Sequence, residues 1–291
     1  MVYEYCLKIH FPEEAAQEME NAYQALIGDD AIRAMMEDVK TSMVTPGDGR
    51  FLTIVNQIAQ KSGIHPYTVS MVSLLASLDA GRKKYQEKGY SETLFWESAE
   101  ALTTKLWECK QVYDIWGTFV VDALKLVLDG SLLRIGRLEY MLTSFQKEEY
   151  RGIVKKGDCV LGCHIPSSGP LTTDLVLDSL KRAYDYYPEA RYDGKLVVNC
   201  HSWLLYPPHY ELFPDSGNMR KFYELFDVID STAIASNHNF WRIFGRNYDP
   251  SILDQVPADT RLRRNFLEFL KAGNVMGNGY GMLVFDGEKI V

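Results

Sequence analysis

The sequence predicts an α+β protein in which an N-terminal helical bundle precedes a domain built on a mixed α/β sheet. The chain has 291 residues, more than a single hydrophobic core usually supports, so we expect two domains. In residues 1–130 apolar side chains recur at helical spacing, whereas from residue 131 short apolar runs alternate with helical patterns. Such alternation is typical of a sheet covered by helices. The predicted domains are therefore 1–130 and 131–291.

The first half contains one very regular apolar stripe, which steps by three or four residues from Phe95 to Trp116. Such a stripe lies on one face of a helix and must be buried. We predict a single helix here, beginning near Ser91 and ending near Gly117. Further helical faces are predicted at 29–39, 51–63, 71–78 (ended by Gly81) and 120–127 (ended by Asp129-Gly130). We interpret their apolar residues as the core of a bundle and not as a cofactor site.

The second half alternates between two kinds of pattern. Apolar residues three and four apart indicate helices, and short apolar runs between turn residues indicate strands. The predicted order is strand 137–142, strand 158–165, helix 174–187, strand 195–203, helix 219–229, strand 240–245, helix 261–273 and strand 279–287.

The composition argues against several classes of partner. A formal net charge of -8 and a pI near 5.3 disfavour general binding of nucleic acid or anionic membranes. No apolar run reaches the ~18–20 residues of a membrane span, and the N-terminus lacks the pattern of a secretory signal. We therefore expect a cytoplasmic protein. The five cysteines are odd in number and scattered, so they are expected to be free thiols.

The segment 162–174, "GCHIPSSGPLTTD", joins a predicted strand to a predicted helix through small residues. The first N–H groups of a helix lack partners within it, and the helix dipole adds partial positive charge there, so an anion can bind. Gly169 allows a positive φ angle, and Pro170 suits the first turn of a helix. An ordinary turn capped by Ser168 or Thr172 explains the same pattern. The residues alone leave both interpretations open.

Segments 162–174 and 198–206, "VNCHSWLLY", resemble a family of bacterial acyltransferase-domain proteins, and the likeness continues at 256–285. That family joins an N-terminal helical domain to a C-terminal domain related to the GNAT superfamily of acyl-coenzyme A (acyl-CoA) N-acyltransferases. The resemblance implies a GNAT-like sheet in which the strands ending at His164 and Cys200 run parallel and splay apart. Acetyl-CoA or another acyl-CoA, the implied co-substrate, would lie in that cleft.

The resemblance also implies that the small-residue loop receives the diphosphate of coenzyme A (CoA). The superfamily's Arg/Gln-x-x-Gly-x-Gly/Ala signature is missing, so the assignment rests on the position of the loop. The residues implied in binding are Ile165, Pro166, Ser167, Ser168, Gly169, Leu171 and Thr172.

Direct acyl transfer needs a base for the attacking amine and an acid for the departing thiolate. His201 is the first candidate for the base and His164 the second, although either histidine could instead hold a loop in place. Ser202 is a candidate donor to the thioester or to the leaving sulfur; supporting the turn at Trp203 is the alternative. Tyr280 could supply the phenol that often acts as acid in the superfamily, with core packing as its alternative. The glycines on both sides of it suggest a close approach to the backbone.

Two Cys-His pairs, Cys163-His164 and Cys200-His201, raise the question of a zinc site. Successive strand residues point to opposite faces, so the cysteines are expected on one face and the histidines on the other. A tetrahedral site needs all four ligands around one point, and we therefore predict no metal. His238, between two asparagines, is interpreted as part of a loop entering a strand; a contact with the acceptor is the alternative.

The sequence and the resemblance together predict acyl-CoA-dependent N-acyl transfer to a small-molecule or peptide amine. The amine acceptor comes from the resemblance alone. Two alternatives stay open: a non-catalytic module that binds CoA or another phosphorylated ligand, and a thiol hydrolase that uses Cys200. The expected partners are acyl-CoA and an amine acceptor, with a homodimer as a further possibility and with neither nucleic acid nor membrane.

Overall fold

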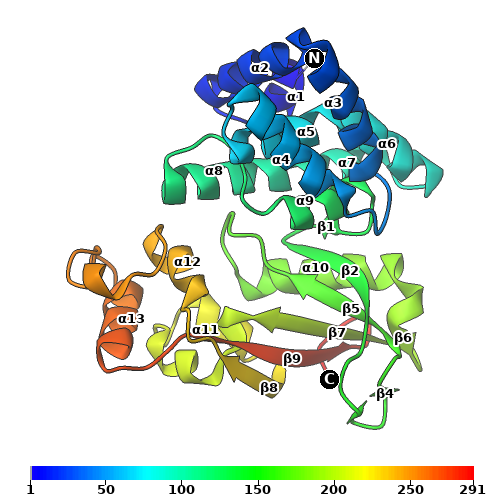
Figure 1. The fold of residues 1–291 in the computed structure, drawn as a ribbon. Helices are drawn as coiled ribbons and strands as arrows, with labels where there is room; N and C mark the ends of the chain where they lie inside the picture. The colour runs from blue at the N-terminus through cyan, green and yellow to red at the C-terminus, as the bar shows by residue number, and fades with distance from the viewer. Residues whose placement is uncertain (1) are drawn as a thin grey trace. The chain divides into compact units, whose positions relative to one another are not determined.

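The computed structural model describes residues 2–291 of the chain. Its internal contacts divide the chain into two compact units, one running to Arg134 and the other spanning Ile135–Val291. The first unit is helical and the second holds a mixed sheet with helices (Figure 1), so the predicted α+β class is confirmed. The boundary between the units lies close to the predicted one at residues 129–130; the assignment of 1–130 and 131–291 as two domains stays a prediction.

The helices of the first unit begin and end where local chemistry favours it. They are α1 (Val2–Lys8), α2 (Glu13–Gly28), α3 (Asp30–Met43), α4 (Arg50–Ser62), α5 (Pro66–Ala76), α6 (Leu78–Glu87), α7 (Glu92–Ala99), α8 (Ala101–Tyr113) and α9 (Val121–Leu128). Asp29 caps α3 by accepting a hydrogen bond from Ile32 N at 2.9 Å, and Ser91 caps α7 in the same way, as predicted. Gly63 ends α4 in the left-handed conformation.

The apolar stripe from Phe95 to Trp116 does not form the single helix that we predicted. It is shared by α7 and α8, which meet at Glu100, and α8 ends at Asp114 in a left-handed conformation. The apolar spacing continues across the break because α8 begins directly after Glu100. Both helices therefore bury the apolar residues of the stripe. Gly117 lies beyond the end of α8 and packs closely against the backbone of Tyr67. A Cβ at Gly117 would lie 2.5 Å from the carbonyl carbon of Tyr67.

The prediction that Gly81 ends a helix is also wrong. Gly81 lies within α6. A Cβ added at Gly81 would meet the carbonyl oxygen of Leu128 at 3.1 Å. Both glycines therefore permit close packing of backbone on backbone.

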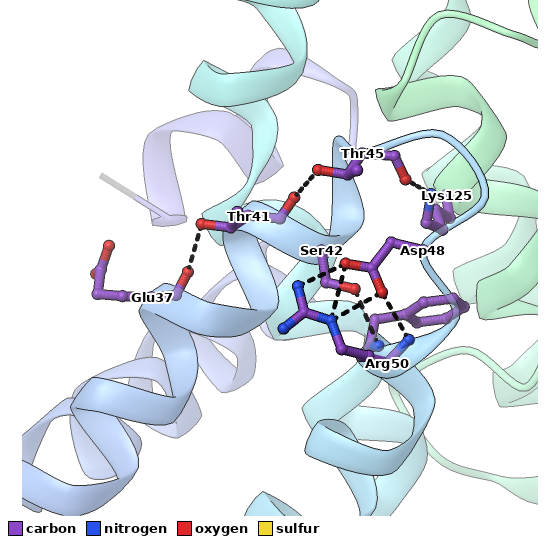
Figure 2. Close-up of polar contacts among 8 residues, drawn as sticks. Glu37, Thr41, Ser42, Thr45, Asp48, Arg50 and Lys125 are labelled. Atoms are coloured by element: carbon purple, nitrogen blue, oxygen red, sulfur yellow. Dashed lines mark hydrogen bonds and ion pairs between the residues drawn. The ribbon is translucent and has the colours of Figure 1, made fainter.

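Polar contacts connect α3, the loop after it and α9 (Figure 2). Thr41 Oγ1 donates to the carbonyl oxygen of Glu37, and Thr45 Oγ1 donates to that of Thr41. The carbonyl oxygen of Thr45 accepts a hydrogen bond from Lys125 Nζ at 2.6 Å. Lys125 also lies 3.4 Å from a carboxylate oxygen of Asp129, and only 6% and 1% of these two side chains are exposed. The pair is thus a buried ion pair inside the helical unit.

The same loop is held to the start of α4 by a second ion pair, which Figure 2 also shows. Arg50 Nη2 donates to Asp48 Oδ2 at 2.7 Å, and Asp48 Oδ1 accepts from the Arg50 backbone N–H. These contacts hold the pKa of Asp48 well below its usual range. Phe51 N donates to Ser42 Oγ at 3.0 Å. The loop is therefore fixed at both of its ends.

The second unit is built on a mixed sheet, whose strands are drawn as arrows in Figure 1. Its elements are β1 (Leu133–Ile135), β2 (Leu138–Ser144), β3 (Glu149–Tyr150), β4 (Val154–Lys155), β5 (Cys159–His164), α10 (Thr173–Tyr186), β6 (Arg191–Tyr192), β7 (Lys195–Ser202), α11 (Asn218–Tyr223), β8 (Asp227–Ala233), α12 (Trp241–Phe244), α13 (Arg261–Lys271) and β9 (Gly277–Phe285). The main sheet has the order β1-β2-β5-β7-β9-β8, with β6 paired to β7.

One parallel pair lies at the centre of this otherwise antiparallel sheet. β5 and β7 pair through Leu161 with Val198 and through Gly162 with Asn199. The ladder ends there, while β5 continues to His164 and β7 continues to Ser202. Beyond Asn199, β7 keeps its pairing with β9 up to Ser202. The carboxyl ends of β5 and β7 and the start of β9 therefore lie at the same end of the sheet.

Two predicted elements of this unit are wrong. The helix predicted at 219–229 ends at Tyr223, and the strand β8 begins at Asp227, so Ile229 lies on an exposed edge strand. The strand predicted at 240–245 is a short helical segment that ends at Gly245. Its apolar residues are three and four positions apart, and the rings of Phe240 and Phe244 stack with centroids 4.3 Å apart. The spacing was helical, and the segment was too short for the period to be recognised.

Both faces of the sheet are covered by apolar residues. On one face, α10 buries Val176, Leu180 and Ala183, and Tyr140 Oη lies 3.0 Å from Ser179 Oγ. On the other face, the β3–β4 hairpin contributes to a cluster made of Phe145, Tyr150, Val154, Val160, Val197, Met282 and Val284.

None of the helices within residues 2–291 has both the length and the apolar character required to cross a membrane.

The chain makes a compact turn directly after β7. Trp203–Leu205 and Pro207–Leu212 form two 3-10 turns. His209 Nδ1 donates to the carbonyl oxygen of Trp203 at 2.8 Å, and its ring lies 4.9 Å from the rings of Tyr206 and Phe266. Complete burial of His209 lowers its pKa from 6.5 to about 4. His209 is thus a neutral histidine that stabilises the turn.

Candidate active site

Polar side chains gather on one face of the sheet, at the end of the parallel ladder. His201 in β7 is the register partner of Tyr280 in β9, and the two ring centroids are 6.4 Å apart. Side chains two apart on a strand share a face, so Asn199 lies on the same face as His201. In β5, Gly162 opposes Asn199, which places His164 on this face as well. The fold therefore brings His164, His201 and Tyr280 to one region.

The phenol of Tyr280 is held by a side chain that the sequence analysis did not single out. Asn199 Nδ2 donates to Tyr280 Oη at 2.7 Å and also reaches Thr143 Oγ1 at 3.4 Å. Because the phenol oxygen accepts this hydrogen bond, its own O–H is directed elsewhere. Burial raises the pKa of Tyr280, while the Asn199 hydrogen bond and the charge of Lys147 act in the opposite direction. Tyr280 is therefore a protonated phenol at neutral pH, fixed in orientation.

An ion pair lies next to this phenol. Lys147 forms a short ion pair with Asp230, which is the register partner of Tyr280 in β8. The Lys147 ammonium lies 5.7 Å from the centroid of the Tyr280 ring. Lys147 also holds the pKa of Asp230 below its usual range. The carboxylate is thus ionised at neutral pH, on the strand that lies beyond Tyr280.

Ser202 is placed differently from the other candidates. It pairs with Gly279 at the end of β7, one residue beyond His201 and so on the opposite face of the strand. Its Oγ accepts a hydrogen bond from Leu204 N at 3.2 Å. This contact starts the 3-10 turn that contains Trp203. Ser202 therefore supports the turn, which is the alternative role that the sequence suggested for it.

The glycines beside Tyr280 do allow a close approach, as the sequence suggested, and the approaching group belongs to the chain itself. A Cβ at Gly279 would lie 1.8 Å from the carbonyl oxygen of Leu205, and one at Gly281 would lie 2.7 Å from Leu205 Cδ1. The turn after β7 therefore packs directly against the backbone of β9, on the face opposite to Tyr280.

The loop between β5 and α10 has the conformation that its glycine predicted, since Gly169 has a φ of +74°. Pro166 and Leu171 are buried, whereas Ser167 and Gly169 are exposed. Thr172 occupies the N-cap position of α10, and its side chain makes no capping hydrogen bond. The alternative in which Thr172 caps the helix is therefore wrong. Small, partly exposed residues at the start of a helix fit an anionic ligand.

An arginine that sequence reasoning missed lies beneath this loop. Arg137 Nε donates to the carbonyl oxygen of Pro170 at 2.8 Å, and Nη2 donates to those of Pro166 at 3.0 Å and Gly169 at 3.3 Å. We predicted Arg137 only as the first residue of a strand; it lies in the turn between β1 and β2. An arginine in a hairpin turn is unremarkable, so the sequence carried no signal for this role.

The cysteines lie on the face opposite to the histidines, as strand alternation predicts. Cys163 and Cys200 are both buried, and Cys200 has 1% of its surface exposed. A hydrogen bond to Cys200, together with burial, raises the pKa of Cys163 well above its usual value. Nucleophilic chemistry needs an accessible thiolate, so these buried thiols do not suit hydrolysis. Among residues 2–291, no three His, Cys, Asp or Glu side chains are grouped so that they could hold a metal ion.

Two other features lie outside this region. His238 is exposed and begins a helical turn, so the strand that we expected after it is absent from this segment. An open depression of about 500 Å³ lies in the helical unit, lined by Glu18, Asn21, Ala22, Ile64, His65, Thr68, Asp114 and Ile115. It includes none of the predicted site residues.

Comparison with known proteins adds two family matches. Residues 2–124 match the family model of an N-acyltransferase N-terminal domain, and residues 132–283 match that of a GNAT-like C-terminal domain. Among curated proteins, no relative matches the chain.

Several solved structures are similar over nearly the whole chain. One is an acyltransferase in complex with decanoyl-CoA and teicoplanin, with 23% identity, a TM-score of 0.78 and coverage of 96% of this chain and 86% of that chain. Another is an acyltransferase with CoA and 10C-teicoplanin, with 23% identity, a TM-score of 0.77 and the same coverage. A third, with decanoyl-CoA, has 20% identity, a TM-score of 0.65 and coverage of 97% and 98%. At these identities the likeness establishes a shared fold.

Proposed function

The chain belongs to the family of N-acyltransferases with a GNAT-like C-terminal domain, and from this premise we propose that it acylates an amine at the end of the β5–β7 ladder. The family confirms the predicted resemblance and makes the chain an acyl-CoA-dependent acyltransferase. The observation that carries the proposed site is the placement of His201 beside Tyr280, whose phenol is held by Asn199. The acceptor and the role of each residue are our proposals.

In this mechanism His201 and Tyr280 move the two protons of the reaction. The co-substrate supplies a thioester carbonyl that an amine can attack. His201, exposed at the end of β7, accepts the proton that the amine must lose. Tyr280 is protonated at neutral pH, since burial raises its pKa further above the ordinary phenol value, and it donates that proton to the departing thiolate. Asn199 keeps the phenol in place throughout. His164, on the same face, is the second candidate for the base.

The loop at residues 165–172 is proposed to bind the CoA diphosphate. Its small exposed residues, the start of α10 without a cap from Thr172, and the guanidinium of Arg137 beneath it support this role. The residues that would contact the co-substrate are Ile165, Pro166, Ser167, Ser168, Gly169, Leu171 and Thr172.

We further propose an acyl chain of medium length and an acceptor amine on a large polar molecule. The support is indirect: similar acyltransferases were solved with octanoyl-CoA, decanoyl-CoA and the glycopeptide teicoplanin. At 22–23% identity these ligands belong to those proteins. They define the first compounds to test on this one.

The test measures the release of free CoA thiol from acetyl-, octanoyl- and decanoyl-CoA, with and without a panel of amines that includes a glycopeptide. Amine-dependent release is the expected result. Binding without any release would favour a CoA-binding module, and release that ignores the amine would favour a hydrolase. Binding is followed by thermal shift, since a ligand at about 100 times its Kd stabilises the fold by about 2.7 kcal/mol.

A further inference from the structure

The contacts of Arg137 fix which way the proposed diphosphate loop faces. The guanidinium reaches the loop from the turn between β1 and β2, and 9% of Arg137 is exposed. It donates hydrogen bonds to the carbonyl oxygens of Pro166, Gly169 and Pro170. Three carbonyl groups of a short loop therefore point toward one buried cation.

Peptide geometry converts this into a statement about the N–H groups. In a trans peptide the carbonyl of one residue and the N–H of the next point in opposite directions, and no peptide bond in the described chain is cis. The N–H groups of Ser167 and Leu171, which follow Pro166 and Pro170, must therefore point away from Arg137. The peptide after Gly169 ends in Pro170 and has no N–H.

We propose that Arg137 is a positioning residue for the diphosphate of acyl-CoA, an inference that rests on the proposed function. By binding the carbonyls from the inner side, the guanidinium presents the Ser167 and Leu171 N–H groups on the outer side of the loop. Its positive charge lies directly behind them and attracts an anion at the same place. Arg137 is buried, so its effect on the ligand is exerted through the loop.

The test compares two ligands that share the reacting arm. Octanoyl-CoA and S-octanoyl-pantetheine have the same thioester and pantetheine arm, and the second lacks the diphosphate together with the 3′-phosphoadenosine attached to it. Lysine at position 137 keeps the charge and lacks the planar fork that reaches several carbonyls. In Arg137→Lys we expect the Kd of octanoyl-CoA, measured by calorimetry, to rise about tenfold, which is about 1.4 kcal/mol. The Kd of S-octanoyl-pantetheine should stay within about twofold of its wild-type value.

Arg191→Lys is the matched control. Arg191 is in the same unit, and its guanidinium lies over the Tyr184 ring at 4.8 Å; its substitution should change neither Kd. If Arg137→Lys weakens both ligands equally, or neither, the positioning role is wrong while the proposed function stands. If wild-type protein binds neither ligand, the proposed function fails and this inference fails with it.

A second measurement uses the wild-type protein and does not depend on how the variant folds. The amides of Ser167 and Leu171 are followed by NMR in protein labelled with ¹⁵N on serine and leucine. Both signals should shift on addition of octanoyl-CoA and remain in place with S-octanoyl-pantetheine. Signals that do not respond to octanoyl-CoA, although calorimetry detects its binding, would overturn the orientation that we infer.

Discussion

Tyr280 is the residue whose environment is most specific for a chemical role. Its hydroxyl accepts a hydrogen bond from Asn199 and its pKa is raised by burial. Tyr280→Phe keeps the ring and removes the proton donor. We expect turnover to fall about 100-fold, the lower range for general acid catalysis, with the Kd for octanoyl-CoA unchanged. Asn199→Ala should give a smaller loss, because the phenol remains and only its orientation is released.

Tyr192→Phe is the control for this substitution. Tyr192 is a partly buried tyrosine whose hydroxyl donates to the carbonyl oxygen of Cys159 at 2.8 Å, away from the site. Its variant should keep the wild-type rate of thiol release. A Tyr280→Phe variant as active as wild type would reduce Tyr280 to a packing residue.

The two candidate bases can be separated by the same substitution at each position. His201 and His164 are both exposed on the same face of the sheet, so glutamine at either position should leave the fold intact. We expect His201→Gln to lower turnover about 100-fold without changing the Kd for octanoyl-CoA, and His164→Gln to have little effect. The rate of amine-dependent thiol release measures both. The reverse pattern would transfer the role to His164.

At this scale the sequence predicts residues whose type suggests chemistry and misses those that act through distant contacts. His201 and Tyr280 were singled out as candidates because histidine and tyrosine carry protons and because the surrounding segments resemble a known family; their catalytic roles stay predictions. Asn199 was missed because its partner Tyr280 is 81 residues away in sequence. Arg137 was missed for the same reason, since its three carbonyl partners lie 29 to 33 residues later.

Among the helices, the contact between α9 and the loop after α3 leads to a stability prediction. The Lys125–Asp129 pair is almost fully buried, so removing one partner leaves an uncompensated charge inside the unit. We expect Asp129→Ala to lower the free energy of unfolding by about 3–5 kcal/mol, measured by urea denaturation. Glu87→Ala removes a partner from the exposed Lys84–Glu87 pair and should cost less than about 1 kcal/mol. Equal losses in the two variants would mean that burial does not strengthen the first pair.

The two errors in predicting elements of the second unit have a common physical origin. Segments 219–229 and 240–245 are short and apolar, and in such segments the helical and strand periods cannot be separated. The sequence from Met219 to Ile229 contains both a helix and an edge strand because the chain turns after Tyr223. By contrast, α10 and α13 were predicted well, since each has an apolar face several turns long.

For the whole molecule, the change of rhythm near residue 131 correctly predicted a helical part and a mixed sheet. The order of strands in the sheet could not be read from the sequence, because pairing partners such as β2 and β5 or β7 and β9 are brought together by tertiary contacts. The resemblance supplied the parallel pair that periodicity could not. Periodicity thus predicts elements, and the site depends on how the elements pair.

The stability of the whole molecule should fall in mild acid because of one buried histidine. His209 has a pKa of about 4 in the folded chain, against an ordinary value of 6.5, because burial disfavours its charged form. Among the described residues its Nε2 atom has no hydrogen-bond partner, so a proton added there finds no acceptor. The folded chain therefore binds fewer protons than the unfolded chain between these two values. The contribution of neutral, buried His209 to the free energy of unfolding is complete above pH 6.5 and decreases as the pH falls toward 4.

This linkage can be measured as a difference between two proteins. Between pH 7.5 and pH 5 the term amounts to about 2 kcal/mol of unfolding free energy. His209→Gln cannot titrate in this range, so urea denaturation at the two pH values should show a loss in wild type that exceeds the loss in the variant by about that amount. The variant itself should be less stable at pH 7.5, because His209 packs against Tyr206 and Phe266. Equal losses of unfolding free energy in the two proteins would mean that His209 gains its proton in the folded state as readily as in the unfolded chain. The burial of His209 beneath the turn after β7 argues against that outcome.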